Sequence, residues 1–423
     1  MTLKYRVDDE AIVRELRSGD TTYSSSLPLP NAPSVERSLA DLGILFDQTL
    51  SRHQRAEREH TRRRVLLGDA FSGIGGFSLG GLLAGDLVGL DVCPQVAIDT
   101  NDTALKLYSS YFADVKAVRA NVDSLVDFNI TRQRSLRFAY EPELVDGPLA
   151  GFKEGLDLVV AGPPCQGHSG FNNVSRRSDP RNRLYLSAAA FGVAAGAQVI
   201  VIENVPEVVL DEAQVVAKTA EVLDSAGYFV SEAVLNAEDF GVAQRRRRHF
   251  MVASRVGRAD IDALASALTV PSRPISWAID DLSTYRGQDS ILDTPAALSE
   301  VNQKRIDFLF EQRLYDLPNS ERPRSHRDGH TYPSVYGRLR WDGPSGVITR
   351  GFMSPGQGRF IHPTERRTLT IHEAFRIQGF PDWYVDRLHA SEIGRRAIAA
   401  GIGEAVPPPL AAIPIAAGLL TII

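Results

Sequence analysis

The feature that most constrains this chain is a series of short apolar runs separated by helix-length segments. From Val65 onward the runs read VLLGDAF, LVGLDV, LDLVVAG and AQVIVIEN. Strands buried on both faces are almost continuously apolar, and parallel strands need crossover helices between them. The sequence therefore predicts an α/β fold with a doubly wound, mostly parallel sheet, which binds ligands at the carboxyl ends of its strands.

The length of 423 residues exceeds that of one ordinary domain. Residues 1–64 are polar and end in SRHQRAEREHTRRR, a segment that reads as a basic helix or a solvated linker, and 21–34 reads as a loop. The apolar tail from Ala405 to Ile423 is broken by prolines, so it predicts a buried strand or helix rather than a membrane span. We expect four parts: an N-terminal extension at 1–64, a catalytic domain at 65–253, a smaller second domain at 254–394, and a segment at 395–423 that returns to the catalytic domain.

Composition narrows the function classes. Two cysteines cannot form a disulfide framework, which fits a reducing cytoplasm. The formal charge of -5 counts mildly against a nucleic-acid binder, but arginines cluster at 52–64, 245–248 and 322–327, so a local basic groove is compatible with it. No Cys/His cluster has metal-ligand spacing, and we expect no metal.

A glycine turn follows the first apolar run. Residues 72–77 read SGIGGF, and a strand that enters such a turn before a helix lets the backbone approach a ligand closely. Asp99 lies one strand further on, where its carboxylate could accept hydrogen bonds from a ribose. Helix packing for the glycines and a helix start for Asp99 are the alternatives. No GKS or GKT follows, which excludes a P-loop.

A second loop, AGPPCQGHS, follows the strand LDLVV and carries Cys165. Its two prolines fix the direction of the cysteine, and a thiolate is a strong nucleophile where its surroundings lower the thiol pKa. Cys93 is interpreted instead as a buried apolar residue.

The next strand ends at Glu203, beside the expected position of Cys165. Cytosine C5 is a poor nucleophile until a thiolate adds to C6 while another group protonates or hydrogen-bonds N3. A glutamate in a closed pocket can supply that second group, so the Cys/Glu pair suits cytosine chemistry.

At this point the chain resembles the DNA (cytosine-5) methyltransferase family. The motifs DAFSGIGGFSLG, GPPCQGHSGFNN, ENV, QRRRRHF, RRTLTIHEAFRIQGFP and GEAVPPPLA occur in the family's order between Val65 and Ala411. The resemblance implies a Rossmann-like methyltransferase fold, S-adenosylmethionine or a close analogue such as its decarboxylated form as donor, and a target-recognition domain within about 254–364.

The family's residue roles carry over position by position. The catalytic residues are Cys165 as nucleophile, Glu203 as the N3 partner, and Arg246 and Arg248, which steady the flipped base and the cysteine loop. The donor-binding residues are Phe71, Gly73, Ile74, Gly75, Gly76, Asp99, Asn121, Val122, Pro163, Glu404 and Ala405. The DNA-binding residues are Gln166, Ser169, Gln244, Arg245, Arg247, Arg322, Arg324, Arg327, Gln378 and Gly379.

Two positions depart from the family pattern. Asn121 replaces the usual acidic residue, and Glu404 replaces the asparagine of the last motif. Three interpretations of Glu404 stay open. It points away and bonds an arginine of the second domain, it weakens methylation, or it favours a donor whose transferred group is cationic, such as aminopropyl.

The resemblance predicts a monomeric enzyme of a bacterial or phage-infected cytoplasm that acts on double-stranded DNA, with a restriction endonuclease as a partner and no membrane contact. The alternatives are the same chemistry on RNA, the same chemistry with a modified donor, and an inactive DNA-binding relative. The presence of both Cys165 and Glu203 speaks against the last.

Overall fold

The computed structural model describes residues 1–423 except 9–10, 29–38, 58–62, 133–134, 146, 148, 150–151, 153–154, 165–182, 284–290, 328–333 and 389–391. The chain forms two compact units. The first unit comprises 1–236, 247–269 and 406–423, and the second comprises 237–246 and 270–405. The chain therefore passes from the second unit back to the first between Arg246 and Arg247, and again after Ala405.

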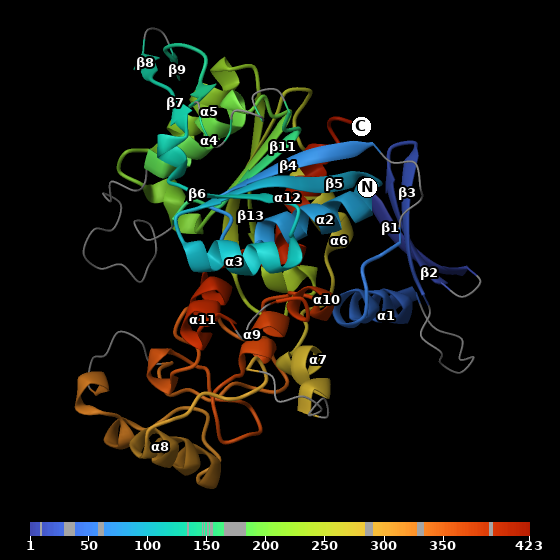
Figure 1. Cartoon of the computed structure of the whole chain (residues 1–423). Helices are drawn as coiled ribbons and strands as arrows, with labels where there is room; N and C mark the ends of the chain where they lie inside the picture. Colours follow the sequence, from blue (N-terminus) through green and yellow to red (C-terminus); the bar gives the residue numbers. More distant parts are fainter. Residues whose placement is uncertain are drawn as a thin grey trace. The chain divides into compact units, whose positions relative to one another are not determined.

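The first unit is built on the predicted sheet (Figure 1). Seven strands lie in the order β13-β14-β12-β11-β4-β5-β6. Pairing is parallel from β12 through β6, and β14 is antiparallel to both of its neighbours. The strands are β4 (Arg64–Ala70), β5 (Asp91–Asp99), β6 (Lys116–Arg119), β11 (Leu158–Ala161), β12 (Val199–Asn204), β13 (Phe229–Asn236) and β14 (Arg247–Ser254).

Helices cover both faces of this sheet. They are α2 (Gly76–Val88), α3 (Asp102–Tyr111), α4 (Leu184–Ala194), α5 (Val215–Ser225), α6 (Ile261–Leu268) and α12 (Pro408–Leu419). A Cβ on Gly192 of α4 would meet Ile200, whereas a Cβ on Gly418 of α12 would meet Val199. Successive residues of a strand point to opposite faces, so α4 and α12 lie on opposite sides of β12. The doubly wound α/β prediction is confirmed.

The apolar C-terminal tail forms α12, which is buried along its length and packs on α2. Gly80 permits this approach, because a Cβ there would lie 2.5 Å from the Cβ of Ala411. The prediction of a buried element is confirmed. Among the described residues no single helix is long and apolar enough to cross a membrane, and α11 (Arg395–Glu404) and α12 meet that test only when taken together as a bent pair.

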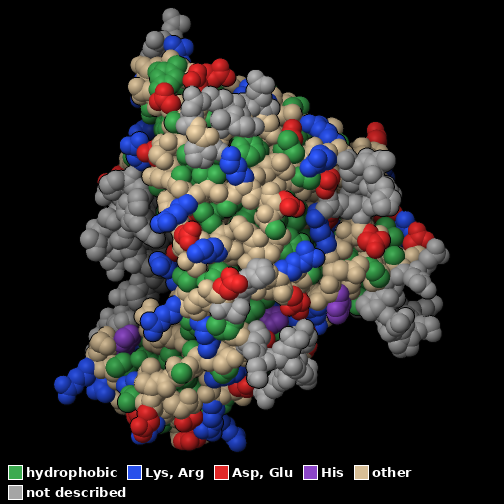
Figure 2. All heavy atoms as spheres, viewed as in Figure 1, with side chains coloured by type: hydrophobic (Ala, Val, Ile, Leu, Met, Phe, Trp, Pro, Cys, Tyr) green, Lys and Arg blue, Asp and Glu red, His purple; other side chains and the backbone are tan. Residues whose placement is uncertain are grey.

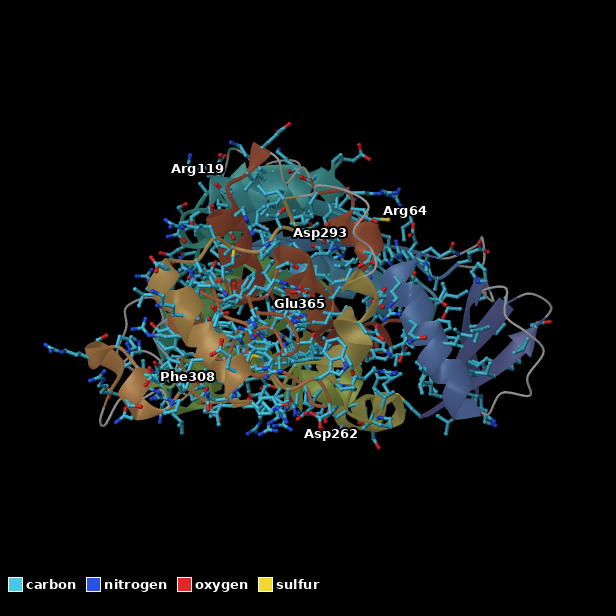
Figure 3. All side chains as sticks on the ribbon, turned by 90° about the horizontal axis from the view of Figure 1, so that it is seen from below. Arg64, Arg119, Asp262, Asp293, Phe308 and Glu365 are labelled. Carbon is cyan, nitrogen blue, oxygen red and sulfur yellow. The ribbon has the colours of Figure 1, made fainter. Side chains whose placement is uncertain are left out.

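The N-terminal region contains more regular structure than the polar, partly loop extension that the sequence predicts. Strands β1 (Thr2–Asp8), β2 (Ala11–Ser18) and β3 (Thr21–Pro28) form an antiparallel sheet, followed by α1 (Leu39–Arg52). Figure 3 shows α1 against this sheet, where Phe46 and Ile12 are fully buried. The loop expected at 21–34 is wrong for Thr21–Pro28, because the serine- and threonine-rich strand is held by backbone pairing to β2.

Two smaller strand pairs extend the first unit between β6 and β11. They are β7 (Val126–Asp127) with β10 (Glu143–Leu144), and β8 (Ile130–Arg132) with β9 (Leu136–Phe138). Cys93, within β5, is partly exposed rather than buried, and its thiol donates to Asp91 Oδ2 at 3.2 Å. The interpretation of Cys93 as a buried apolar residue is corrected accordingly.

The second unit is mainly helices and loops. Its helices are α7 (Ile275–Ile279), α8 (Glu300–Glu311), α9 (Ile371–Ile377), α10 (Asp382–Val385) and α11. The helical pattern predicted at TLTIHEAFRIQGF becomes α9, on which α7, α10 and α11 pack. Residues 254–269 belong to the first unit and 395–405 to the second. The main segment of this unit, 270–405, therefore begins and ends later than the expected 254–394, and the unit also includes the earlier segment 237–246.

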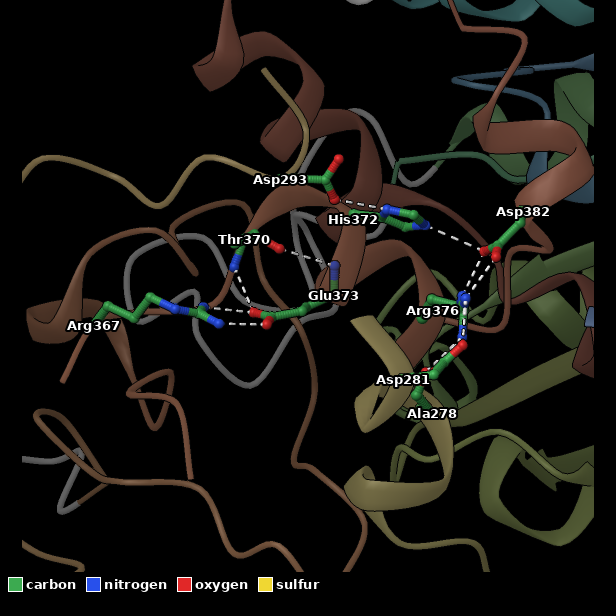
Figure 4. Close-up of polar contacts among 9 residues, drawn as sticks. All are labelled: Ala278, Asp281, Asp293, Arg367, Thr370, His372, Glu373, Arg376 and Asp382. Atoms are coloured by element: carbon green, nitrogen blue, oxygen red, sulfur yellow. Dashed lines mark hydrogen bonds and ion pairs between the residues drawn. The ribbon is translucent and has the colours of Figure 1, made fainter. Parts of the chain in front are cut away.

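Helix α9 carries buried charges that tie the second unit together (Figure 4). Thr370 and Glu373 form a capping box at its N-terminus, and Arg367 Nη2 donates to Glu373 Oε1 at 2.6 Å. A buried charge is costly without a partner, so the Arg367–Glu373 pair lowers the cost of burying the N-terminus of α9.

On its other side α9 presents His372, whose ring contacts Asp293 at 2.8 Å and Asp382 at 3.2 Å. Arg376 bonds the same Asp382 and also Asp281. Burial by itself would lower the pKa of His372, but the two carboxylates outweigh it and raise that pKa to about 9. The ring is therefore a cation at neutral pH.

Charges of both signs are interspersed over the described surface seen in Figure 2. This distribution agrees with the small formal charge of -5.

Candidate active site

The glycine turn lies at the carboxyl end of β4 and leads into α2. Three residues there have left-handed backbone, Phe71 at φ 61°, Gly73 at φ 53° and Gly75 at φ 87°. A Cβ on Gly75 would lie 3.0 Å from the Tyr108 ring, whereas a Cβ on Gly73 would meet nothing within 4 Å. Phe71 has this φ without being glycine, which is uncommon and concentrates at ligand sites. The turn is thus packed on one side and open on the other.

Asp99 ends β5 beside this turn. Its Oδ2 accepts from Gly73 N at 2.9 Å, and its Oδ1 accepts from Asn101 N at 2.8 Å. Each carboxylate oxygen can accept a second bond, and the side chain is only partly buried. The helix-start function belongs to Asn101, which caps α3, so Asp99 is available to a ligand at the turn.

Asn121 and Val122 follow β6, two strands from the turn. The Asn121 side chain accepts from Asp123 N at 3.2 Å and caps a short 3-10 helix (Val122–Ser124), while Val122 is fully buried. Ala120 N donates to Asp99 O at 3.0 Å, which places this corner next to the end of β5. Asn121 is exposed and leaves its amide N–H groups available to a ligand.

The buried Asp69 beneath the turn was not predicted as a site residue. Its Oδ2 accepts from Ser78 Oγ at 2.6 Å, and Ser78 Oγ also contacts Tyr108 Oη at 2.7 Å. Burial raises the pKa of Asp69 to about 7, although the bonds from Ser78 oppose the rise. Its only signal in the sequence is its position at the end of an apolar strand.

Two polar atoms of this turn are buried and have no partner among the described residues, Asp69 Oδ1 and Ser72 Oγ. Buried polar atoms normally have partners, so unpaired ones next to an open turn fit a polar ligand. A donor that carries a ribose, a cation and hydrogen-bonding groups fits this set of carboxylates, hydroxyl and open backbone.

The cysteine loop leaves the sheet between β4 and β12. Gly162 N donates to Ala70 O at 3.3 Å, and Asn204 Nδ2 donates to Pro163 O at 3.3 Å. The fully buried Asn204 therefore fastens the start of the loop to the end of β12. Cys165, Gln166 and Ser169 lie outside the described residues.

Glu203 lies at the carboxyl end of β12, as predicted, and is 7% exposed. Arg248 Nε lies 2.7 Å from Glu203 Oε1, and both side chains are nearly buried. The pair forms because β14 runs antiparallel beside β12, with Phe250 opposite Glu203. Arg248 is two residues from Phe250, so its side chain points to the same face of the sheet.

The arginine run alternates between buried and exposed positions. Arg246 is 2% exposed, whereas Arg245 and Arg247 are exposed. Arg245 pairs with Glu238 at 3.3 Å. This two-residue period is that of an extended strand. It separates Arg246 and Arg248, which reach inward, from Arg245 and Arg247, which face solvent.

Arg246 lies in the second unit and binds backbone carbonyls. It donates to Ile348 O at 3.3 Å, to Gly403 O at 3.2 Å and to Ala405 O at 3.0 Å. A Cβ on Gly403 would collide with the backbone of Thr349 and Arg350. The last motif, GEAVPPPLA, is therefore packed tightly against that loop segment. Arg246 therefore holds the last motif in place.

Two expected DNA contacts are corrected by their burial. Gln244 and Gln378 are both fully buried, and Gln244 Nε2 donates to Gln378 Oε1. Gln378 Nε2 donates to Ala405 O at 2.8 Å, and Gln244 Oε1 accepts from Ile348 N at 3.0 Å. Their amides are used up inside the second unit, because a buried amide must be satisfied there.

Glu404 points outward from the same motif. Arg350 Nε lies 3.3 Å from its Oε1, and the Glu404 side chain is 49% exposed. This is the arrangement of the first of the three interpretations, in which the carboxylate bonds an arginine of the second domain. Ala405, by contrast, is buried.

The remaining predicted DNA contacts lie in loops of the second unit. Arg322 donates to Leu317 O at 2.9 Å, and Arg327 donates to Arg322 O at 2.8 Å, so both guanidinium groups brace their own loop. Arg324 is exposed. Gly379 has φ 83° and terminates α9, a position that favours glycine.

Among the described residues no group of three or more His, Cys, Asp or Glu is placed to hold a metal ion.

Comparison with known proteins gives a consistent result. The sequence pattern of the C-5 cytosine-specific DNA methylases matches residues 66–417. The type II methyltransferase M1.BsuMI of Bacillus subtilis is 36% identical over 96% of this chain and 92% of its own. The type II methyltransferase M1.HphI of Haemophilus parahaemolyticus is 29% identical over 81% of this chain and 83% of its own.

Solved structures agree in fold. A prophage-encoded DNA modification methyltransferase of E. coli superposes with a TM-score of 0.55 at 21% identity, covering 84% of this chain and 98% of that one. The Dnmt2 methyltransferase of S. pombe gives 0.53 at 17% identity, covering 85% and 98%.

Proposed function

The chain belongs to the C-5 cytosine-specific DNA methylase family, and from this premise we propose that Cys165 and Glu203 carry its reaction on duplex DNA. The protein is a DNA (cytosine-5) methyltransferase, and the family implies S-adenosylmethionine as its donor. The observation that carries the residue assignment is the nearly buried pair of Arg248 on β14 and Glu203 on β12, the strand next to the one that leads into the cysteine loop.

Cys165 acts as the nucleophile on a cytosine turned out of the helix. Its sulfur forms a bond to C6 while Glu203 hydrogen-bonds and protonates N3, which moves electron density to C5. Bound S-adenosylmethionine would supply an electrophilic methyl carbon for bonding to C5, with the neutral thioether as the leaving group. Loss of the C5 proton to a base then expels the Cys165 thiolate and restores the ring.

Arg248 acts as a positioning residue for Glu203. A guanidinium 2.7 Å from one carboxylate oxygen fixes the plane of the carboxyl group. Asn204 fastens the Pro163 end of the cysteine loop from the same strand end. Asn204, which fastens the start of the nucleophile's loop, and Glu203, the proposed N3 partner, are therefore neighbouring residues of β12.

The donor would bind over the open side of the glycine turn. Gly73 and Phe71 offer backbone, Asp99 accepts from the ribose, and Asn121 offers its amide near the adenine. Asp69 Oδ1 and Ser72 Oγ, which have no partner within the described part of the chain, support a polar ligand at this turn. The Glu404–Arg350 pair supports methyl as the transferred group, because it gives the extra carboxylate a cation of its own.

The second unit, 237–246 with 270–405, is proposed as the target-recognition domain. Its arginine-rich loops suit the phosphates and base edges of a duplex. The relation to type II methyltransferases suggests a modification enzyme of a bacterial or phage-infected cytoplasm, monomeric and with a partner endonuclease of the same specificity.

The test is the mass of the product nucleoside. Unmethylated duplex DNA is incubated with the protein and labelled S-adenosylmethionine, digested and analysed by mass spectrometry. We expect cytosine heavier by one methyl group, also when decarboxylated donor is supplied in competition, and no product with Cys165→Ala. A folded wild-type protein that modifies no cytosine would overturn the proposal, and a heavier adduct would overturn the assignment of methyl.

A further inference from the structure

A stack of alternating arginines and aromatic rings runs through the second unit beside α8. Arg340 lies with its guanidinium carbon 4.3 Å from the centre of the Tyr315 ring. Arg338 lies 5.3 Å from the same ring and 3.9 Å from that of Phe310. Arg366 continues the series at 5.8 Å from Phe310. We call these five residues the arginine ladder.

Hydrogen bonds to backbone carbonyls hold Arg338 and Tyr315, the middle residues of the arginine ladder. Arg338 Nε donates to Pro363 O at 2.7 Å, and Arg338 N donates to Tyr315 O at 2.8 Å. Arg359 Nη1 donates to the carbonyls of Tyr315 and Arg338 at 3.1 and 2.9 Å. Tyr315 is therefore held at its backbone carbonyl by two donors, and its ring contacts both Arg338 and Arg340.

The two ends of the arginine ladder, Arg366 and Arg340, differ in whether a carboxylate compensates their charge. Arg366 contacts Asp307 at 3.3 Å and Glu311 at 3.5 Å. The exposed Arg340 has neither a carboxylate nor a carbonyl partner in the part of the chain that the structure describes.

Most other arginines of this unit are occupied. Arg350 and Arg359 have carboxylate partners, and Arg322 and Arg327 bond carbonyls of their own loop. Arg340 thus combines a cation that has no carboxylate partner among the described residues with an aromatic ring beneath its guanidinium group.

We propose that Arg340, held on the Tyr315 ring, contacts the DNA duplex and is a determinant of target binding. This inference rests on the function proposed above and names the part of the second unit that reaches the substrate. It replaces Arg322 and Arg327, which the sequence favoured, because their guanidinium groups are occupied within their own loop.

The arginine guanidinium presents a planar fork of N–H donors, and DNA offers two kinds of acceptor for it. Phosphate oxygens and the O6/N7 edge of guanine both take it bidentately. Stacking on a ring leaves those edges free while restricting the side chain before binding, so less rotamer freedom is lost on contact. A lysine at this position keeps the charge but loses both the fork and the stacking.

The experiment starts by mapping the methylated site on plasmid DNA with the wild-type enzyme. Binding of the full chain to a duplex with that site, and to one with the site scrambled, is then measured at several salt concentrations. We expect Arg340→Ala to weaken binding to the mapped site about five- to hundredfold, and Arg340→Lys to recover only part of the loss.

The pattern of the loss identifies the acceptor. A guanine contact gives a loss confined to the mapped duplex, so that discrimination falls. A phosphate contact weakens both duplexes equally and lowers the salt slope by about one. Tyr315→Leu should give a smaller loss, and the double variant should bind like Arg340→Ala, because the ring acts through the arginine.

Arg396→Ala is the matched control, since Arg396 is an exposed arginine of the same unit and has no cation–π contact with a ring of the described residues. It should bind as the wild type does, and thermal unfolding shows that each variant is folded. Equal binding by folded Arg340→Ala and wild type, while the wild type methylates, would overturn this inference alone. Absence of any methylated site with wild type would overturn the proposed function instead.

Discussion

Arg248 on β14 and Glu203 on β12 face each other at 2.7 Å, and their side chains are 12% and 10% exposed. Two residues that are 45 positions apart in sequence thus meet because β14 enters the sheet antiparallel to β12. Removal of one partner from such a pair leaves an uncompensated charge in a poorly hydrated place.

The first prediction concerns that pair. Arg248→Ala should lower the free energy of unfolding by about 3 kcal/mol and kcat/KM by about a hundredfold, because Glu203 loses its orientation. Arg248→Lys should recover part of kcat/KM. Urea unfolding and single-turnover methylation measure the two effects. Unchanged turnover in a folded Arg248→Ala protein would contradict the positioning role.

The second prediction concerns Asp69, whose pKa burial raises to about 7. The folded state therefore holds a proton that the unfolded chain releases near pH 4. This contribution is fully present below about pH 4 and is lost as the pH rises toward 7. Over the whole interval from pH 4 to pH 7, the free energy of unfolding falls by about 4 kcal/mol from this group.

Asp69→Asn provides the comparison. It should flatten the fall in stability between pH 4 and 7 seen by urea unfolding. A wild type and an Asp69→Asn variant with parallel stability profiles over that range would show that Asp69 titrates normally.

The third prediction concerns His372, whose pKa is raised to about 9 by Asp293 and Asp382 against the effect of burial. A raised pKa in a base gives stability that is complete below about pH 6.5 and disappears as the pH passes 9. His372→Gln should be less stable than wild type at pH 6, with a difference that narrows at pH 10. Thermal unfolding at the two values measures it, and a difference that is constant with pH would refute it.

The fourth prediction concerns Gly403. A Cβ at this position would collide with the backbone of Thr349 and Arg350, so Gly403→Ala must displace the last motif. We expect a loss of about 2 kcal/mol or more and faster proteolysis of the second unit. Gly346→Ala is the control, because a Cβ there meets nothing within 4 Å. Equal stability of the two variants would contradict the tight packing.

Local sequence patterns were sufficient to predict the position of a residue that lies at the end of a strand. Glu203 and Asp99 each end an apolar run, and the ends of parallel strands share one edge of a sheet, so their neighbourhood was predictable. The left-handed backbone of the SGIGGF turn was likewise marked by its glycines.

Burial and pairing between distant segments were not predictable in the same way. Gln244 and Gln378 resemble surface amides in sequence, yet they are buried against each other because chain segments 134 residues apart come together. The β1–β3 sheet was missed because Thr21–Pro28 has little apolar periodicity, and its strand form depends on pairing with β2.

The sequence by itself determined the family and the doubly wound sheet, and it predicted the donor turn and the roles of Cys165 and Glu203, because each depends on residues close together in the chain or on motif order. Only the tertiary structure decided which charges are satisfied. It paired Arg248 with Glu203, buried Asp69, turned Glu404 toward Arg350, and left Arg340 exposed on Tyr315. These outcomes depend on desolvation and on contacts between distant segments, which no local pattern encodes.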